Sequence, residues 1–146
     1  MEKIIINTDG GSRGNPGQGA IGVVFSDEKG NVIKKYGEKI GICTNNEAEY
    51  KALIFAFKKA KQIFGKDKIK SFEIELRSDS ELMVSQITGR YKIQNEKIGK
   101  LFLEAWNLMT DLPKINFLAV KREQNKTADQ MVNWALDGEG ESQKLF

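Results

Sequence analysis

The chain has 146 residues, of which 40% are hydrophobic and 29% are charged, as expected for one globular domain. Its formal net charge of +3 is too small to indicate a nucleic-acid partner by itself. The absence of histidine excludes catalytic triads and zinc sites that depend on it, and the single Cys43 excludes an internal disulfide and a cysteine metal cluster.

The first third of the chain predicts three strands joined by hairpins. The first contains three consecutive isoleucines, which is typical of a strand buried on both faces in the middle of a sheet. We expect strands over 3–9, 20–25 and 32–40, with a glycine-rich loop over 10–17 and a hairpin turn over 27–31. Asp9 then lies just past the carboxyl end of the first strand, which is where open α/β sheets bind ligands.

A long helix follows these strands. Thr44 and Glu47 have capping-box spacing, so the helix should begin here and run to Gly65. Its apolar stripe recurs at helical spacing and consists of Leu53, Ala56, Phe57, Ala60 and Phe64. Glu49 lies on this stripe, one turn before Leu53. Because a carboxylate that faces the core needs a partner, Glu49 is a candidate functional residue, whereas capping alone explains Glu47.

The second half of the chain alternates strands with helices. We expect a strand over 71–78, a short helix over 82–87, a helix capped by Asn95 that ends before Pro113, a strand over 115–120 and a last helix capped by Asn125. Asp79 directly follows the strand over 71–78, and Asp129 lies in the opening turn of the last helix. Taken singly, each of these two acids is equally well explained as an acid favoured at a helix start.

These elements predict an α/β fold with a five-stranded mixed sheet, three antiparallel strands followed by parallel strands, flanked by helices. The helical crossover should make the strand over 71–78 parallel to the strand over 3–9. If these two strands are neighbours, Asp9 and Asp79 lie side by side, and the helix that carries Glu49 can present its acid to them. We therefore expect the acids to form one site.

The sequence shows no internal repeat and no domain boundary. We expect residues 1–137 to form one domain and residues 138–146 to be a polar tail. No apolar run reaches the roughly 20 residues that a membrane span needs, and a lone cysteine suits a reducing compartment. We therefore expect a cytoplasmic protein that has no membrane partner.

One competing motif predicts a dinucleotide site. Residues 17–22 match the pattern G-x-G-x-x-G, and Glu38 follows at about the required 20 residues. In a dinucleotide-binding fold these glycines open a helix, whereas here they lead into a strand and a hairpin turn. We reject the dinucleotide site on this ground. The clustered carboxylates remain, and an all-oxygen ligand set suits Mg²⁺ or Mn²⁺ rather than zinc or copper.

Four motifs resemble those of the type 1 ribonuclease H family. They are TDGGSRGNPG at 8–17, TNNEAE at 44–49, SDS at 78–80 and NKTAD at 125–129, in the order that the family has them. The resemblance implies a ribonuclease H-like fold and an endoribonuclease that hydrolyses the RNA strand of RNA/DNA hybrids, leaving 5′-phosphate and 3′-hydroxyl ends. It also implies two Mg²⁺ ions, for which Mn²⁺ can substitute, held by Asp9, Glu49, Asp79 and Asp129.

The resemblance further implies which residues contact the substrate. Asn15, Asn45 and Asn46, together with the backbone of Gly11, Ser12 and Arg13, resemble the minor-groove contacts to both strands of the hybrid. Thr44 resembles the residue on the side of the DNA phosphates. An amide side chain suits this role because it offers both donors and an acceptor, as a 2′-hydroxyl does.

Two departures from the family pattern change these expectations. Many relatives have a histidine in the loop before the last aspartate, whereas residues 120–124 contain none. Arg122, as a phosphate ligand, and Glu123, in acid–base steps, are the candidates to assist here. Residues 87–95 are too few for the basic protrusion of longer relatives, which predicts weaker hybrid binding and some cleavage of RNA/RNA duplexes.

The oligomeric state that we expect is a monomer. Two other functions remain open at this point. One is a nucleic-acid binding module that has the same fold but weak or no catalysis. The other is a phosphodiesterase that acts on small nucleotides, which would also use two metal ions but would not need the asparagine-rich substrate contacts.

Overall fold

The structure is a computed structural model that describes residues 2–138, so residues 139–146 of the predicted polar tail lie outside it. The strands are β1 (Lys3–Gly14), β2 (Gly17–Asp27), β3 (Val32–Cys43), β4 (Glu73–Ser78) and β5 (Ile115–Ala119). The helices are α1 (Asn45–Phe64), η1 (Lys68–Ser71), α2 (Glu81–Ile87), α3 (Glu96–Met109), η2 (Arg122–Gln124) and α4 (Lys126–Leu136). In this part of the chain, no helix has the length and apolar character that a membrane span requires.

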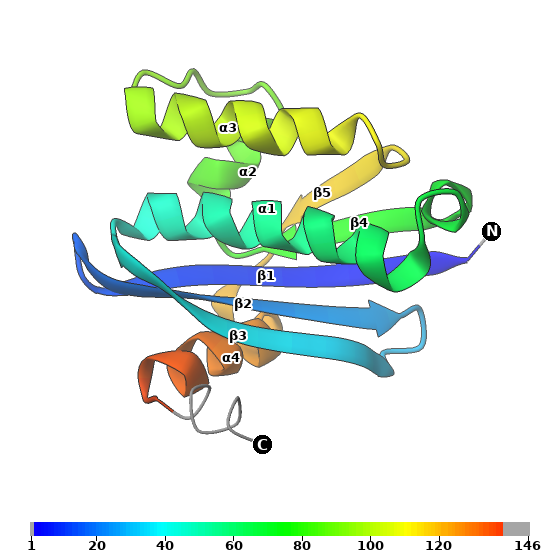
Figure 1. The fold of residues 1–146 in the computed structure, drawn as a ribbon, viewed down its shortest axis with the longest axis horizontal. Helices are drawn as coiled ribbons and strands as arrows, with labels where there is room; N and C mark the ends of the chain where they lie inside the picture. Colours follow the sequence, from blue (N-terminus) through cyan, green and yellow to red (C-terminus); the bar gives the residue numbers. More distant parts are fainter. Residues whose placement is uncertain (1, 139–146) are drawn as a thin grey trace.

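The five strands form one mixed sheet in the order β3-β2-β1-β4-β5 (Figure 1). β1, β2 and β3 are antiparallel neighbours, whereas β4 pairs parallel to β1 and β5 pairs parallel to β4. β1 is therefore the central strand, as its three isoleucines predicted, and the predicted fold class is confirmed. The parallel register ends with Thr8 opposite Ser78, so the residues that follow, Asp9 and Asp79, are brought together.

The predicted loop over 10–17 is wrong, because this segment continues the sheet. β1 runs on to Gly14 and pairs with β2 as far as Gly14 opposite Gly17. Glycine-rich segments usually form loops, but here the backbone groups pair in an antiparallel ladder. The glycines also leave room for neighbouring backbone, since a Cβ on Gly17 would lie 2.1 Å from the Arg13 carbonyl oxygen. Asp9 is consequently inside β1 and not past its end, although it directly follows the part of β1 that pairs with β4.

Helices cover the two faces of the sheet. α1 packs on β1 and β2, α3 packs on the outer side of α1, and α4 packs on β2 and β3 from the opposite face (Figure 1). Two glycines allow α4 to approach closely. A Cβ on Gly22 would lie 2.1 Å from the Ala128 carbonyl oxygen, and one on Gly37 would lie 2.4 Å from the Met131 carbonyl oxygen. These two glycines therefore determine how closely α4 approaches the sheet.

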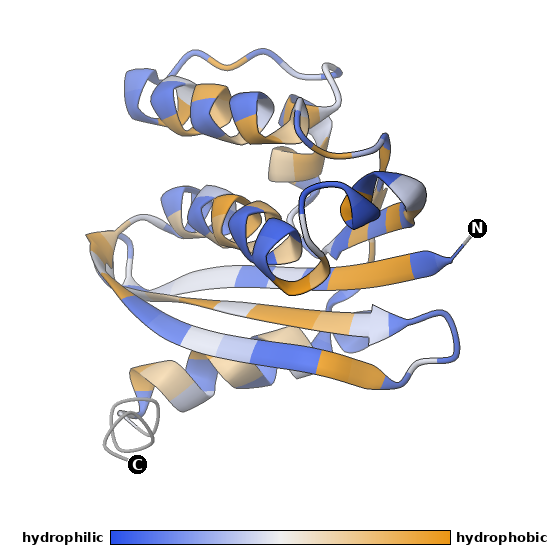
Figure 2. Cartoon of the chain, turned by 45° about the vertical axis from the view of Figure 1, so that its right-hand side comes forward, coloured by the Kyte–Doolittle hydropathy of each residue, from blue (hydrophilic) through white to orange (hydrophobic). Residues whose placement is uncertain are grey.

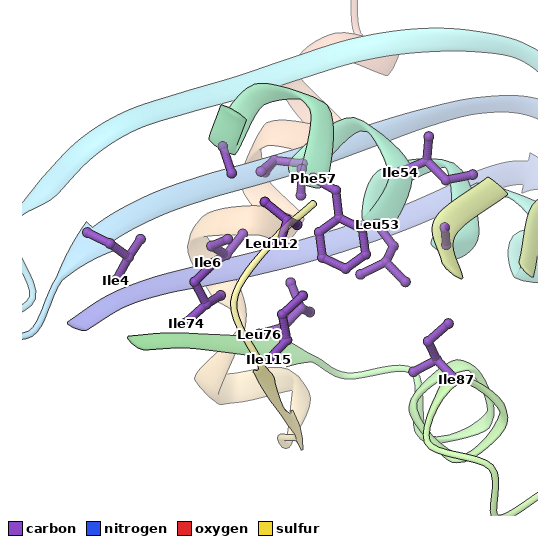
Figure 3. Close-up of a cluster of buried hydrophobic side chains, with 14 of the residues drawn as sticks. Ile4, Ile6, Leu53, Ile54, Phe57, Ile74, Leu76, Ile87, Leu112 and Ile115 are labelled. Carbon is purple, nitrogen blue, oxygen red and sulfur yellow. The ribbon is translucent and has the colours of Figure 1, made fainter. Parts of the chain in front are cut away.

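The main core lies between α1 and the sheet. Leu53 and Phe57 of α1 point towards Ile6 of β1 and Leu76 of β4, and all four side chains are fully buried (Figure 3). The predicted stripe of α1 is confirmed, since Leu53, Ala56, Phe57 and Ala60 are buried and Phe64 packs against the same cluster. α1 and α3 carry hydrophobic residues beside hydrophilic ones along their length (Figure 2), as expected for helices with one buried side.

The N-terminus of α1 has the predicted cap. Thr44 Oγ1 accepts a hydrogen bond from the Glu47 amide at 3.1 Å, and the Thr44 amide donates to Glu47 Oε1 at 2.9 Å. Both halves of the capping box are thus present, which confirms the start of the helix. This start determines the phase of the helix and therefore places Glu49 on the side of α1 that faces the sheet.

Candidate active site

Three of the four predicted acids converge at the end of the β1–β4 pairing. Asp9 comes from β1, Glu49 from the first turns of α1, and Asp79 from the residue after β4. One carboxylate oxygen from each lies within 4.8 Å of the others. Asp9 thus lies next to Glu49 and Asp79, which follow it by 40 and 70 positions in the sequence. The parallel register brings Asp79 to Asp9, and the capping box places Glu49 beside them.

Gly10 allows α1 to reach this point. A Cβ on Gly10 would lie 2.3 Å from the Ala48 carbonyl carbon and oxygen and 2.6 Å from the Glu49 nitrogen, so no larger residue fits between β1 and α1. The Gly10 amide also donates a hydrogen bond of 2.8 Å to Glu49 Oε1. The backbone of β1 therefore holds Glu49 directly beside Asp9.

The three acids repel one another in a site with little solvent. Asp9 is 7% exposed, and burial together with the charges of Asp79 and Asp129 raises its pKa to about 8. Burial, then the charges of Asp9 and Asp79, raises the pKa of Glu49 well above its ordinary value. Burial also raises the pKa of Asp79, although the nearby Arg122 guanidinium opposes this change.

This donor set fits a divalent cation. Carboxylates that are drawn together and disfavoured as anions become stable once a bound cation neutralises them. The only cationic side chain paired with them in residues 2–138 is Arg122, whose Nε lies 4.0 Å from Asp79 Oδ2. Because all the donors are carboxylate oxygens, they suit a hard ion such as Mg²⁺ or Mn²⁺.

Asp129 approaches from the other face of the sheet. It lies in the first turn of α4, outside the group of three oxygens within 4.8 Å, but its charge acts on both Asp9 and Asp79. The predicted side-chain cap of this helix is wrong. Asn125 occupies the N-cap position without a capping hydrogen bond, because its Oδ1 instead accepts from Asn7 Nδ2 of β1 at 2.9 Å. Its Nδ2 donates to the Thr8 carbonyl of β1 at 2.9 Å.

A polar pocket of about 820 Å³ adjoins the acids. It is lined by Glu49, Asp79, Glu81, Ala119, Val120, Lys121, Arg122 and Glu123. Both residues proposed to compensate for the missing histidine, Arg122 and Glu123, therefore lie next to the acidic cluster, on η2. Glu81 was not identified from the sequence. Its position two residues after Asp79 was the available signal, but an acid in the first turn of α2 is also explained by the helix dipole.

The predicted substrate residues gather where the β1–β2 hairpin meets the start of α1. Asn45 Oδ1 accepts hydrogen bonds from the Ser12 amide at 3.0 Å and from Ser12 Oγ at 3.1 Å. Asn15 Oδ1 accepts a hydrogen bond from the backbone N–H of Asn45 at 2.9 Å. Both amide oxygens are thus engaged inside the protein. What these two side chains offer to a ligand is their NH₂ donors.

The remaining predicted contacts lie close by. Gly11 lies in β1 next to Ser12, and Arg13 Nη2 is ion-paired with Asp137 Oδ1 at 2.7 Å. Asn46 Oδ1 is buried and has no hydrogen-bond partner within residues 2–138. Asn46 also lines a pocket of about 440 Å³ together with Thr44, Glu47 and residues 95–98 of α3 and its cap. The sequence did not predict this pocket, because it depends on the packing of α3 against α1.

Comparison with known proteins agrees with this geometry. A family model described as reverse transcriptase-like matches residues 7–135. LC11-RNase H1, which was isolated from compost by a metagenomic approach, has a solved structure and is 44% identical in sequence to this chain. The two structures match with a TM-score of 0.89 over 95% of this chain and 99% of that chain. RNase H1 from the archaeon Halobacterium salinarum is 35% identical, with a TM-score of 0.86 over 93% of this chain and 98% of that chain.

Some curated relatives are longer than this chain. A bifunctional protein of Mycobacterium tuberculosis is 36% identical over 141 residues, which cover 96% of this chain and 37% of that protein. Ribonuclease HI of Halobacterium salinarum is 40% identical over 129 residues, which cover 88% of this chain and 62% of that protein. The chain thus spans between about a third and two thirds of these relatives. On its motifs, its sheet order and these matches, the chain belongs to the type 1 ribonuclease H family.

Proposed function

We propose that this chain is an endoribonuclease that hydrolyses the RNA strand of RNA/DNA hybrids with divalent metal ions. The observation that carries the proposal is the convergence of Asp9, Glu49 and Asp79, whose oxygens lie within 4.8 Å of one another. Family membership supports it, and LC11-RNase H1, which is 42% identical in this comparison, has been crystallised with an RNA/DNA hybrid. Residues 1–137 then constitute one catalytic domain. Because every acid comes from one chain, a monomer is sufficient for catalysis.

In this mechanism the four acids bind the metal and orient the reacting groups. Two Mg²⁺ ions, or Mn²⁺ ions in their place, would supply activation of the attacking water and stabilisation of the leaving 3′ oxygen. Asp9 interacts with each of the other acids, so it would hold the metal ions together with them. The Gly10 amide orients Glu49, and α4 brings Asp129 to Asp9 from the opposite side. The products are a 5′-phosphate and a 3′-hydroxyl.

Arg122 and Glu123 assist at the edge of this site. The Arg122 side chain is 86% exposed and lies beside Asp79, so it can bind a phosphate oxygen without leaving its place. A guanidinium keeps its charge at every working pH, which suits phosphate binding but not proton transfer. Glu123 is exposed and lies in the same pocket, where its carboxylate assists in acid–base steps.

Substrate recognition depends on the asparagines at the hairpin and the start of α1. Asn15 and Asn45 offer NH₂ donors, because their oxygens are already engaged, and such donors match the acceptor atoms of the minor groove and the 2′-hydroxyl oxygen. Asn46 and the backbone of Gly11, Ser12 and Arg13 complete this surface. Thr44 contacts the DNA phosphates from the neighbouring pocket, where the N-termini of α1 and α3 favour an anion.

A cleavage assay tests this proposal. Labelled RNA would be presented in an RNA/DNA hybrid, in an RNA/RNA duplex and as a single strand, with Mg²⁺ or Mn²⁺, at stated salt concentrations. We expect cleavage of the hybrid. We also expect some cleavage of the RNA/RNA duplex, at a lower rate. The eight residues from Thr88 to Asn95 leave no room for a basic protrusion, so the RNA/RNA duplex should not be fully excluded. Strict hybrid specificity at low salt would contradict the second expectation. A wild-type protein that binds the hybrid but cleaves it with neither ion would instead be a binding module.

A further inference from the structure

The N-cap residue of α4, Asn125, connects this helix to β1 by hydrogen bonds. Asn125 is 1% exposed, and its side chain makes two hydrogen bonds to β1. Its Nδ2 donates to the Thr8 carbonyl oxygen at 2.9 Å, and its Oδ1 accepts from Asn7 Nδ2 at 2.9 Å. Both partners precede Asp9 directly in the chain, and the Asn125 carbonyl accepts the first helical hydrogen bond from the Asp129 amide at 3.1 Å.

This connection is short on both sides. Asp129 is one helical turn after Asn125, and Asp9 is one residue after Thr8. Gly22, which is opposite Asp9 in the β1–β2 register, lies beneath Ala128, the residue before Asp129. A glycine contact under the first turn therefore sets how closely α4 approaches, but a smooth contact does not stop a helix from sliding or turning. The two amide hydrogen bonds of Asn125 do.

The helix gives up a cap to make this connection. An asparagine at the N-cap ordinarily accepts a hydrogen bond from the helix N-terminus, as Asn95 does for the Ile98 amide in α3 at 3.1 Å. In α4 the corresponding oxygen is used by Asn7 instead, and the described residues supply no side-chain cap. An asparagine whose only role was to cap α4 would instead direct its side-chain oxygen to a backbone amide in the first turn of the helix.

We infer that the Asn7–Asn125 amide pair is a positioning element that holds Asp129 at the correct place relative to Asp9 and Asp79. This inference rests on the proposed function of the same acids. Neither asparagine touches the reacting atoms, so both act through the acids that they place. Because such supporting residues fix ligand geometry, their loss typically lowers metal affinity or activity by about 10- to 100-fold.

The test compares Asn125→Ala, Asn7→Ala and the double variant with the full-length wild-type protein. We expect Asn125→Ala to lower kcat about 10- to 100-fold with a nearly unchanged KM, and to raise the Mg²⁺ concentration for half-maximal activity. Asn7→Ala should have a smaller effect, since the hydrogen bond to Thr8 remains. Adding it to Asn125→Ala should change nothing further, because Asn7 has then already lost its partner.

A matched control separates positioning from simple loss of stability. Leu112 is buried at the other end of the fold, beside the ion pair of Asp111 with Lys61 in the last turn of α1. Leu112→Ala should lower the melting temperature at least as much as Asn125→Ala while leaving kcat and the Mg²⁺ dependence unchanged below that temperature. A second measurement needs no activity: the rise in melting temperature on adding Mg²⁺ to the protein alone should be smaller in Asn125→Ala than in wild type.

The outcomes are distinguishable. If Asn125→Ala keeps the wild-type kcat and Mg²⁺ dependence, or loses activity only in proportion to its stability as Leu112→Ala does, the positioning role is refuted. If the wild-type protein cleaves nothing, the proposed function is refuted, and the positioning role is then decided by the Mg²⁺-induced rise in melting temperature. An equal rise in Asn125→Ala and wild type would overturn it.

Discussion

The Asp9→Asn variant should abolish cleavage and, without metal, make the protein more stable. The pKa of Asp9 is raised to about 8 in the folded protein from an ordinary 3.8, because burial and the charges of Asp79 and Asp129 disfavour its anion. Since the folded protein binds this proton more tightly than the unfolded chain, stability falls as the pH rises from about 4 towards 8. Asparagine carries no charge and removes this dependence at position 9.

The size of the effect follows from the same values. The difference between 3.8 and about 8 corresponds to about 5 kcal/mol of lost stability at pH 8. A buried asparagine amide that lacks hydrogen-bond partners offsets about 1–3 kcal/mol of this gain. We therefore expect a net gain of roughly 2–4 kcal/mol for Asp9→Asn without metal, which is about 5–12 °C in melting temperature for a chain of this length.

Thermal unfolding followed by circular dichroism measures this gain. The two proteins would be unfolded with a chelator at about pH 5 and about pH 8, and again with Mg²⁺. The advantage of Asp9→Asn should grow with pH and shrink when Mg²⁺ is added, because the ion relieves the repulsion that only the wild type retains in full. Asp67→Asn, at an exposed aspartate of the loop before η1, is the control. It should change neither the pH dependence nor the Mg²⁺ dependence of the melting temperature. A variant that is no more stable than wild type at pH 8 would refute this account of the site.

Other substitutions test how the site is built. Gly10→Ala should destabilise the fold by about 1–3 kcal/mol and reduce activity, because its Cβ would lie 2.3 Å from the Ala48 backbone, whereas Gly99→Ala in α3, which meets nothing within 4 Å, should raise the melting temperature. Asn45→Asp should keep the hydrogen bonds to Ser12 and the stability but raise KM at least about tenfold, since it loses the NH₂ donor and adds a negative charge; an unchanged KM would exclude Asn45 from substrate binding. Arg122→Ala should lower the slope of log affinity against log salt by about 1 for the hybrid, and Arg122→Lys should restore it.

The identity and order of the elements were largely readable from the sequence. Capping-box spacing and an apolar stripe are local signals, so they predicted α1 and the inward position of Glu49 correctly. The run of isoleucines predicted the central strand for the same reason. The β1–β2 extension was missed because glycine-rich segments pair only when a neighbouring strand supplies the hydrogen bonds, which no local pattern reveals.

The sequence by itself determined which acids are present, that no histidine accompanies them, and on which elements they lie. Only the tertiary structure decided that Asp9, Glu49 and Asp79 meet within 4.8 Å while Asp129 approaches from the opposite face. It also decided that Asn125 bonds to β1 in place of capping α4. The physical reason is that distances and pKa changes depend on strand register, helix approach and burial, which come from contacts between residues far apart in the chain.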